Sequence, residues 1–97
     1  MYKVVFKKTA QTHIEQAATW YSLQQSGLET RFLDEIDEAV DTLALNPFFA
    51  LRYADVRSIL LKSFPYLLFY RINELKKTIK IIAVLHGHAN SNKWPKT

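Results

Sequence analysis

The stretch YLLFYRINELKKTIKIIAVLH, residues 66–86, decides the fold. Its first part, Tyr66–Ile72, alternates between two faces with a period of two and is rich in aromatic and β-branched residues, which is typical of a strand. The polar residues 73–77 predict a hairpin loop. Residues 78–86 are apolar on both faces, which is typical of a central strand. This stretch therefore predicts an antiparallel hairpin whose second strand lies inside a sheet.

The residues upstream predict two helices joined by a short turn. Thr12 and Glu15 have the spacing of a capping box, so the first helix is expected over residues 12–25, with Gly27 just past its end. The second helix is expected to begin at Leu28 or Glu29. An apolar stripe follows on one face, and Asp34, Glu35, Asp37, Glu38 and Asp41 form a solvated face opposite. Asn46-Pro47 ends this helix, because a residue before proline avoids the helical region.

Two further strands are predicted, over residues 2–7 and 56–61, with a turn at 63–65. The element order is then β-α-α-β-β-β. We therefore predict an α+β fold in which a helical hairpin packs on one face of a mainly antiparallel four-stranded sheet. Tyr66 and Tyr70 are expected under the helices.

Length and composition limit the class of protein. The chain has 97 residues, of which 48% are hydrophobic and 23% charged, and it has no cysteine. We expect one domain over residues 1–97, without disulfides or thiolate chemistry. No apolar run approaches the roughly 20 residues of a membrane helix, and the first residues do not resemble a signal peptide. A cytoplasmic location without membrane binding is the expectation.

The charge is divided unevenly along the chain. Residues 1–50 carry four basic and seven acidic side chains, whereas residues 51–97 carry nine basic and two acidic ones. A cationic half favours nucleic acid or an acidic protein as a partner, although a solvated surface explains it equally well. Depending on the strand register, the face of the sheet away from the helices is expected to carry Arg57, Lys62, Arg71 and Lys80. Such a face would hold phosphates.

The histidines are the other candidates for chemistry. His86 and His88 follow the last strand, but without nearby cysteines or carboxylates they do not predict a metal site, and no cofactor is expected. His86 is a candidate general base, because histidine is the side chain most often used for proton transfer, and a histidine hydrogen-bonded at a strand end is the simpler interpretation.

Several motifs resemble the RelE/ParE toxin superfamily of type II toxin–antitoxin systems, formerly called plasmid stabilization proteins. The resemblance rests on Phe64-Pro65-Tyr66, Tyr70-Arg71-Ile72, Ile81–His86 and Trp94, and in the first half on Trp20-Tyr21, Gly27, Phe32-Leu33 and Asn46-Pro47. It extends over residues 2–94, and it implies the same fold that the periodicity predicts.

The family has two branches, and the resemblance favours the ParE side. RelE-like members cleave mRNA on the ribosome with a set of basic side chains and a C-terminal tyrosine. In this chain the corresponding basic positions are Ser58, Leu60, Leu67 and a position near His88, and Trp94 stands in place of the tyrosine. Leucine does not neutralise a phosphate or transfer a proton, so enzymatic cleavage is not expected. The Phe-Pro-Tyr turn and the His-to-Trp spacing are more similar to ParE-like members, which inhibit DNA gyrase.

The resemblance also implies a cognate antitoxin as partner. The residues that we select for partner contact are Arg57, Lys62, Arg71, His86, His88, Lys93 and Trp94. Two alternatives stay open: a ribosome-dependent mRNA endonuclease, with Arg57, Lys62 and His88 as catalysts, and a binding module without toxicity. Many relatives have an arginine and a proline where this chain has Ala89 and Ser91, which leaves its potency open. A homodimer and a toxin–antitoxin hetero-oligomer are both compatible with the sequence.

Overall fold

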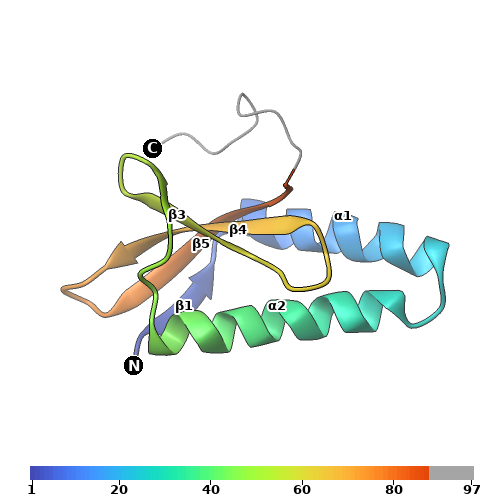
Figure 1. Cartoon of the computed structure of the whole chain (residues 1–97), viewed down its shortest axis with the longest axis horizontal. Coiled ribbons are helices and arrows are strands. Elements are labelled where there is room, and N and C mark those ends of the chain that lie inside the picture. Colours follow the sequence, from blue (N-terminus) through green and yellow to red (C-terminus); the bar gives the residue numbers. More distant parts are fainter. Residues whose placement is uncertain (88–97) are drawn as a thin grey trace.

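The computed structural model describes residues 1–87, which form two layers (Figure 1). The elements, in chain order, are β1 (Lys3–Phe6), α1 (Lys8–Gln24), α2 (Leu28–Leu45), β2 (Leu51–Tyr53), β3 (Val56–Leu60), β4 (Tyr66–Asn73) and β5 (Thr78–His86). The five strands form one sheet in the order β1-β5-β4-β3-β2. The two helices form an antiparallel hairpin on one side of this sheet, and the predicted α+β class is confirmed.

Strand β5 lies between β1 and β4, as its apolar pattern predicts. It pairs in parallel with β1, with Phe6 opposite Ile81, and antiparallel with β4, with Asn73 opposite Thr78. Four of its side chains are less than 3% exposed: Ile79, Ile81, Ala83 and Val84. Phe69 is opposite Ala83 and Tyr70 is opposite Ile81, so Ile82 of β5 has no partner on β4 and the alternation of β5 is interrupted there. Both Ile82 and Ala83 consequently belong to the apolar cluster away from the helices.

Each face of the sheet has its own apolar cluster. The larger one joins the helices to the sheet through Phe32, Leu43, Leu68, Tyr70 and Ile81, which are all fully buried. The second cluster lies on the opposite surface, called the far face below, and consists of Val56, Leu67, Phe69, Ile82 and Ala83. The far face is therefore apolar at its centre rather than uniformly charged.

The first helix begins earlier than predicted. It runs from Lys8, so Thr12 and Glu15 lie inside it and their predicted capping box is wrong. The first helical turn is anchored differently, because the amide of Lys7 donates to the carbonyl of Ile81 at 2.8 Å and thereby ties the helix entry to β5. Gly27 has a φ of 86°, as its predicted place in the turn between the helices requires.

The sheet has five strands rather than four, because the short β2 was not predicted. Its three residues are too few to show a clear alternation, and its turn to β3 contains no glycine. Ala54 takes a positive φ of 45° there instead. Leu51 pairs with Arg57 at the edge of the sheet.

The hydroxyl of Tyr70 connects the sheet to the segment that leaves α2. It donates to the carbonyl of Pro47 at 2.6 Å and accepts a long 3.4 Å hydrogen bond from the amide of Phe49. Arg57 Nη1 donates to the Phe49 carbonyl at 2.6 Å, and its guanidinium lies 5.3 Å from the centre of the Phe48 ring. Tyr70 is fully buried, so this hydroxyl cannot exchange its partners for water.

Tyr70→Phe is expected to lower the free energy of unfolding by about 1 kcal/mol, because the buried carbonyl of Pro47 loses the shorter of its two hydrogen bonds and keeps only the one from the Phe49 amide at 3.0 Å. Urea denaturation measures the change. Tyr66→Phe is the matched control, since the described residues give its hydroxyl no hydrogen bond, and it is expected to change stability by about 0.5 kcal/mol or less. Equal losses in the two variants would contradict the role assigned to the Tyr70 hydroxyl.

Candidate functional site

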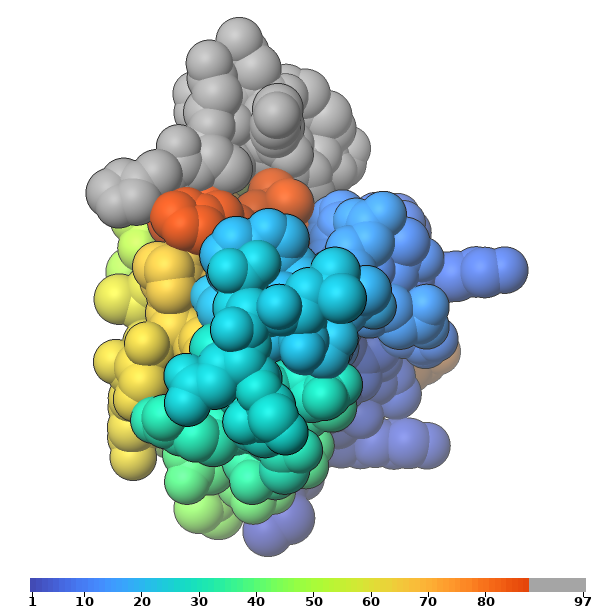
Figure 2. Space-filling view, turned by 90° about the vertical axis from the view of Figure 1, so that its right-hand side faces the viewer, coloured from blue at the N-terminus to red at the C-terminus, as the bar shows by residue number. Residues whose placement is uncertain are grey.

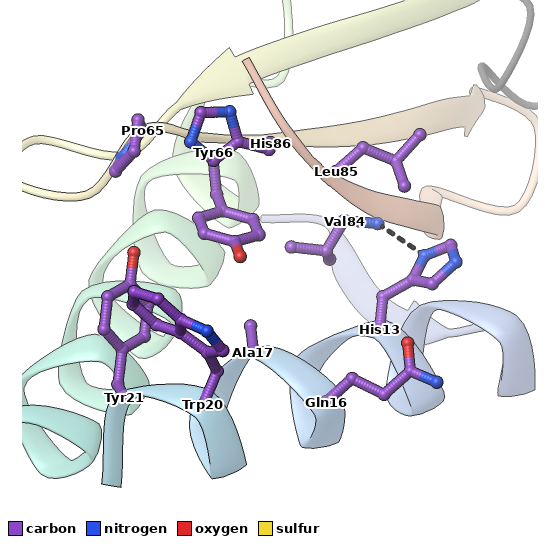
Figure 3. Close-up of a pocket in the computed structure, with 10 residues that line it drawn as sticks. All are labelled: His13, Gln16, Ala17, Trp20, Tyr21, Pro65, Tyr66, Val84, Leu85 and His86. Atoms are coloured by element: carbon purple, nitrogen blue, oxygen red, sulfur yellow. Dashed lines mark hydrogen bonds between the residues drawn. The ribbon is translucent and has the colours of Figure 1, made fainter. Parts of the chain in front are cut away.

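A groove of about 620 Å³ separates α1 from the C-terminal half of β5 (Figure 3). It is called the α1–β5 groove below. It is lined by His13, Gln16, Ala17, Trp20, Tyr21, Pro65, Tyr66, Val84, Leu85 and His86. Figure 2 shows the end of β5 at the surface, between α1 and the segment that leads into β4.

The groove exists because β1 is shorter than β5. Strand β1 has four residues and pairs only as far as Ile81, whereas β5 continues to His86. Among residues 1–87, no strand lies beside the β1-facing edge of β5 beyond Ile81, and α1 lies there instead. The amide of Val84 on this edge donates to Nδ1 of His13 at 3.1 Å, as the dashed line in Figure 3 shows. The side chain of His13 thus accepts the hydrogen bond that a neighbouring strand would otherwise accept from Val84.

This contact determines the protonation of His13. Because Nδ1 accepts a hydrogen bond, the proton of the neutral imidazole is on Nε2. Burial lowers the pKa of His13 below its usual value, so the ring is neutral at physiological pH. His13 is therefore a structural acceptor here.

Aromatic rings form the other wall of the groove. Trp20 is 56% exposed and stands edge-on to Tyr21 at 5.3 Å between ring centres. Tyr66 approaches His86 in the same manner at 5.5 Å. Burial raises the pKa of the Tyr66 hydroxyl, so it stays neutral. The groove therefore offers a mainly apolar surface with a large exposed indole, which is suited to binding an apolar segment of a partner.

The predicted contact residues that lie within residues 1–87 are in separate places. Arg57 is opposite Tyr70 in the register and so points to the helix side, where it binds the carbonyl of Phe49. Lys62 lies beside Glu35 and Glu38 of α2. The expectation that Arg57 and Lys62 share the far face with Arg71 is therefore wrong, because the register places Arg57 on the side of the helices and Lys62, beyond the end of β3, lies beside α2.

Arg71 and His86 lie in two further places. Arg71 is opposite Lys80 on the far face, and its Nε lies 3.3 Å from Asp55 Oδ1, an ion pair without the direction of a good hydrogen bond. His86 lines the α1–β5 groove. His88, Lys93 and Trp94 lie outside the described residues. Within residues 1–87, no three histidines, cysteines or carboxylates are grouped closely enough to bind a metal ion.

Reasoning from the sequence missed His13 as part of the site. Its partner Val84 is 71 residues away, and nothing in the local pattern marks this contact. Trp20 is noticeable as one of only two tryptophans, but its helical spacing does not show that it is exposed. The one feature of the sequence that indicates an exposed Trp20 is its size, because the first helix has a narrow apolar face.

Acid should destabilise the protein partly through His13. The unfolded chain holds this proton with a pKa near 6.5 and the folded chain with a lower pKa, so stability falls as the pH drops below about 6.5. His13→Gln keeps an acceptor for the Val84 amide and does not titrate. Between about pH 7.5 and pH 5, the unfolding free energy of the wild type should therefore fall more than that of the variant. Parallel pH profiles would contradict the contact.

Within residues 1–87, neither helix has the length and apolar content needed to cross a membrane.

The three most informative solved structures are all from toxin–antitoxin systems. The chromosomal ParDE system from P. aeruginosa matches with a TM-score of 0.72 and 18% identity, over 89% of this chain and 96% of that chain. The RelBE2 complex from Mycobacterium tuberculosis matches with a TM-score of 0.64 and 26% identity, over 88% and 96%.

The intact E. coli RelBE complex matches with a TM-score of 0.61 and 18% identity, over 92% of this chain and 100% of that chain. At 18% identity, the P. aeruginosa and E. coli matches show the shared fold alone. No curated protein sequence matches the chain. Residues 4–90 match the model of a family described as the ParE toxin of the type II toxin–antitoxin system parDE. The chain therefore belongs to the ParE toxin family of type II toxin–antitoxin systems.

Proposed function

We propose that this toxin acts as ParE-like members do, by inhibiting DNA gyrase, and that a cognate antitoxin neutralises it. The family match supports a ParE-like toxin. The RelBE2 and RelBE matches are toxin–antitoxin complexes and the P. aeruginosa match is a ParDE toxin–antitoxin system, which supports an antitoxin as the protein partner.

One observation carries the choice of gyrase over mRNA cleavage. The positions at which RelE-like members place basic residues on the sheet are Ser58, Leu60 and Leu67, and the register puts them together on β3 and β4, with Leu60 opposite Leu67. Ser58 is 3% exposed, and its Oγ accepts from Arg52 Nε at 2.6 Å. Arginine keeps its proton at neutral pH, so Arg52 does not serve as a general acid or base. These positions therefore hold no group that would transfer a proton to or from RNA.

The mRNA endonuclease is the second candidate. It is favoured by the 26% identity to the RelBE2 complex, which is higher than the 18% identity to the ParDE system. In that case the catalysts would be a rearranged set, Arg57, Lys62 and His88. The placement of Arg57 and Lys62 on the helix side, with Arg57 bound to the carbonyl of Phe49, argues against this set.

Brief expression from a tightly controlled promoter separates these functions. We expect thymidine incorporation to fall before methionine incorporation, together with induction of the SOS response, because gyrase poisoning breaks DNA whereas mRNA cleavage does not. A fall in methionine incorporation first would contradict the proposal and favour the endonuclease. If neither falls in a gyrase-sensitive host while folded protein accumulates, a binding module without toxicity replaces both.

The α1–β5 groove is the proposed antitoxin contact. It combines a 56% exposed tryptophan with partly buried apolar walls, and none of the residues that line it within the described part of the chain is a lysine or arginine. Exposed tryptophans beside a concave apolar surface are frequent energetic centres of protein interfaces. His86 is the one residue of the predicted contact set that lies in this groove, so we retain it as a proposed contact. An apolar segment of the antitoxin, such as one face of a helix, fits this surface.

Trp20→Ala is expected to weaken antitoxin binding about tenfold or more, because the indole is the largest exposed apolar group of the groove. Calorimetry with the antitoxin encoded in the neighbouring reading frame measures the change. Leu23→Ala is the matched control, since Leu23 is 78% exposed on the same helix but does not line the groove. Equal binding by the wild type and Trp20→Ala, with Leu23→Ala unchanged, would place the antitoxin elsewhere.

A further inference from the structure

The far face carries a group of basic side chains at the β1 side of the sheet. Tyr2, Val4 and Phe6 pack toward the helices, so the alternation of β1 directs Lys3 and Val5 to the far face. Lys7 follows in extended backbone, with φ −67° and ψ 149°, and continues the alternation. Lys3 and Lys7 are therefore on the far face, on either side of Val5.

The neighbouring strands add two more cations beside these lysines. Val5 is opposite Lys80 of β5, and Lys80 is opposite Arg71 of β4. Val5, Lys80 and Arg71 also line one shallow hollow of the surface together with Asp55. Lys3 and Lys7 are then two residues before and two residues after the residue opposite Lys80, on the same face of the sheet. The basic sheet face is defined here as Lys3, Lys7, Lys80 and Arg71.

The charges of this face are only partly compensated within the described residues. Asp55 pairs with Arg71 at 3.3 Å, and Glu74 lies in the turn at the rim of the same hollow. Lys3, Lys7 and Lys80 are exposed, and no salt bridge is formed by them among residues 1–87. Like charges this close repel one another, so a bound polyanion would stabilise the arrangement.

The opposite side of the molecule is acidic. Helices α1 and α2 together carry seven acidic and two basic side chains. The protein is thus a dipole, with its negative end on the helix layer and a positive region on the far face of the sheet. In the field of a polyanion such a dipole turns its sheet toward the anion and its helices away.

We infer that the basic sheet face binds the phosphate backbone of duplex DNA, without reading its sequence. The inference goes beyond gyrase inhibition, because it concerns DNA itself. Lysine is depleted at protein interfaces, and among residues 1–87 the basic sheet face has no exposed apolar anchor apart from Leu75 in the adjoining turn, which argues against an acidic protein. Single-stranded nucleic acid is bound by stacking on exposed aromatic rings. Among residues 1–87, the aromatic residues of the far-face cluster are Phe69, which is fully buried, and Tyr53, which is partly buried against that cluster.

Fluorescence anisotropy with a short labelled DNA duplex tests this on the full chain alone, without gyrase, so its failure is distinct from failure of the proposed function. Three free lysines predict that log K falls with log salt at a slope of about −2.7 between about 50 and 200 mM. In the variant Lys3→Gln/Lys80→Gln the slope should become shallower by about 2, and binding at the lower salt should weaken about tenfold or more. Circular dichroism checks that the variant is folded.

The matched control is Arg31→Gln/Lys62→Gln. It removes the same charge from the helix side and should leave the slope unchanged. An equal loss in the control would show attraction by net charge alone and overturn the inference, as would a wild type that does not bind the duplex. Tighter binding of single-stranded RNA or of polyglutamate than of the duplex, with the same dependence on Lys3 and Lys80, would also overturn it.

Discussion

Strand β5 is the constraint on which the rest of the structure depends. It is buried on both faces and paired on both edges, in parallel with the first strand of the chain and antiparallel with the strand before it. A parallel partner so far away in sequence requires the intervening chain to cross from one end of the sheet to the other. The helical hairpin makes this crossing, and its apolar stripe covers the face that β5 would otherwise expose.

The proposed binding surfaces follow from the lengths and alternation of the strands around β5. Because β1 is five residues shorter than β5, one edge of β5 faces α1 instead of a strand, and the α1–β5 groove opens there. Because β1 alternates, Val4 and Phe6 join the helix-side core, and Lys3 and the following Lys7 are left on the far face. One strand pairing therefore produces an apolar groove suited to a protein and a basic face suited to a polyanion, on different sides of the molecule.

Much of the fold was predictable from local patterns. The boundaries of β5, the positive φ of Gly27 and the helix end at Asn46-Pro47 depend on neighbouring residues and are as predicted. The helix start was not, because the Lys7 amide bonds to Ile81, a contact that no capping pattern records. The site was less predictable still. The sequence shows that a residue is basic but not which face of the sheet it lies on, so Arg57 and Lys62 were assigned to the wrong side. His13 contacts Val84 only in the folded chain, and no local pattern predicts this contact.

The central claim is that a ParE-family toxin without the RelE set of basic residues on its sheet acts on gyrase. The most direct test adds the purified full-length chain to purified gyrase and relaxed plasmid, and to a ribosome-programmed mRNA in parallel. The account predicts inhibited supercoiling with accumulation of broken DNA, suppression of both by an excess of antitoxin, and intact mRNA. Cleavage of the mRNA on the ribosome with unimpaired supercoiling would contradict it.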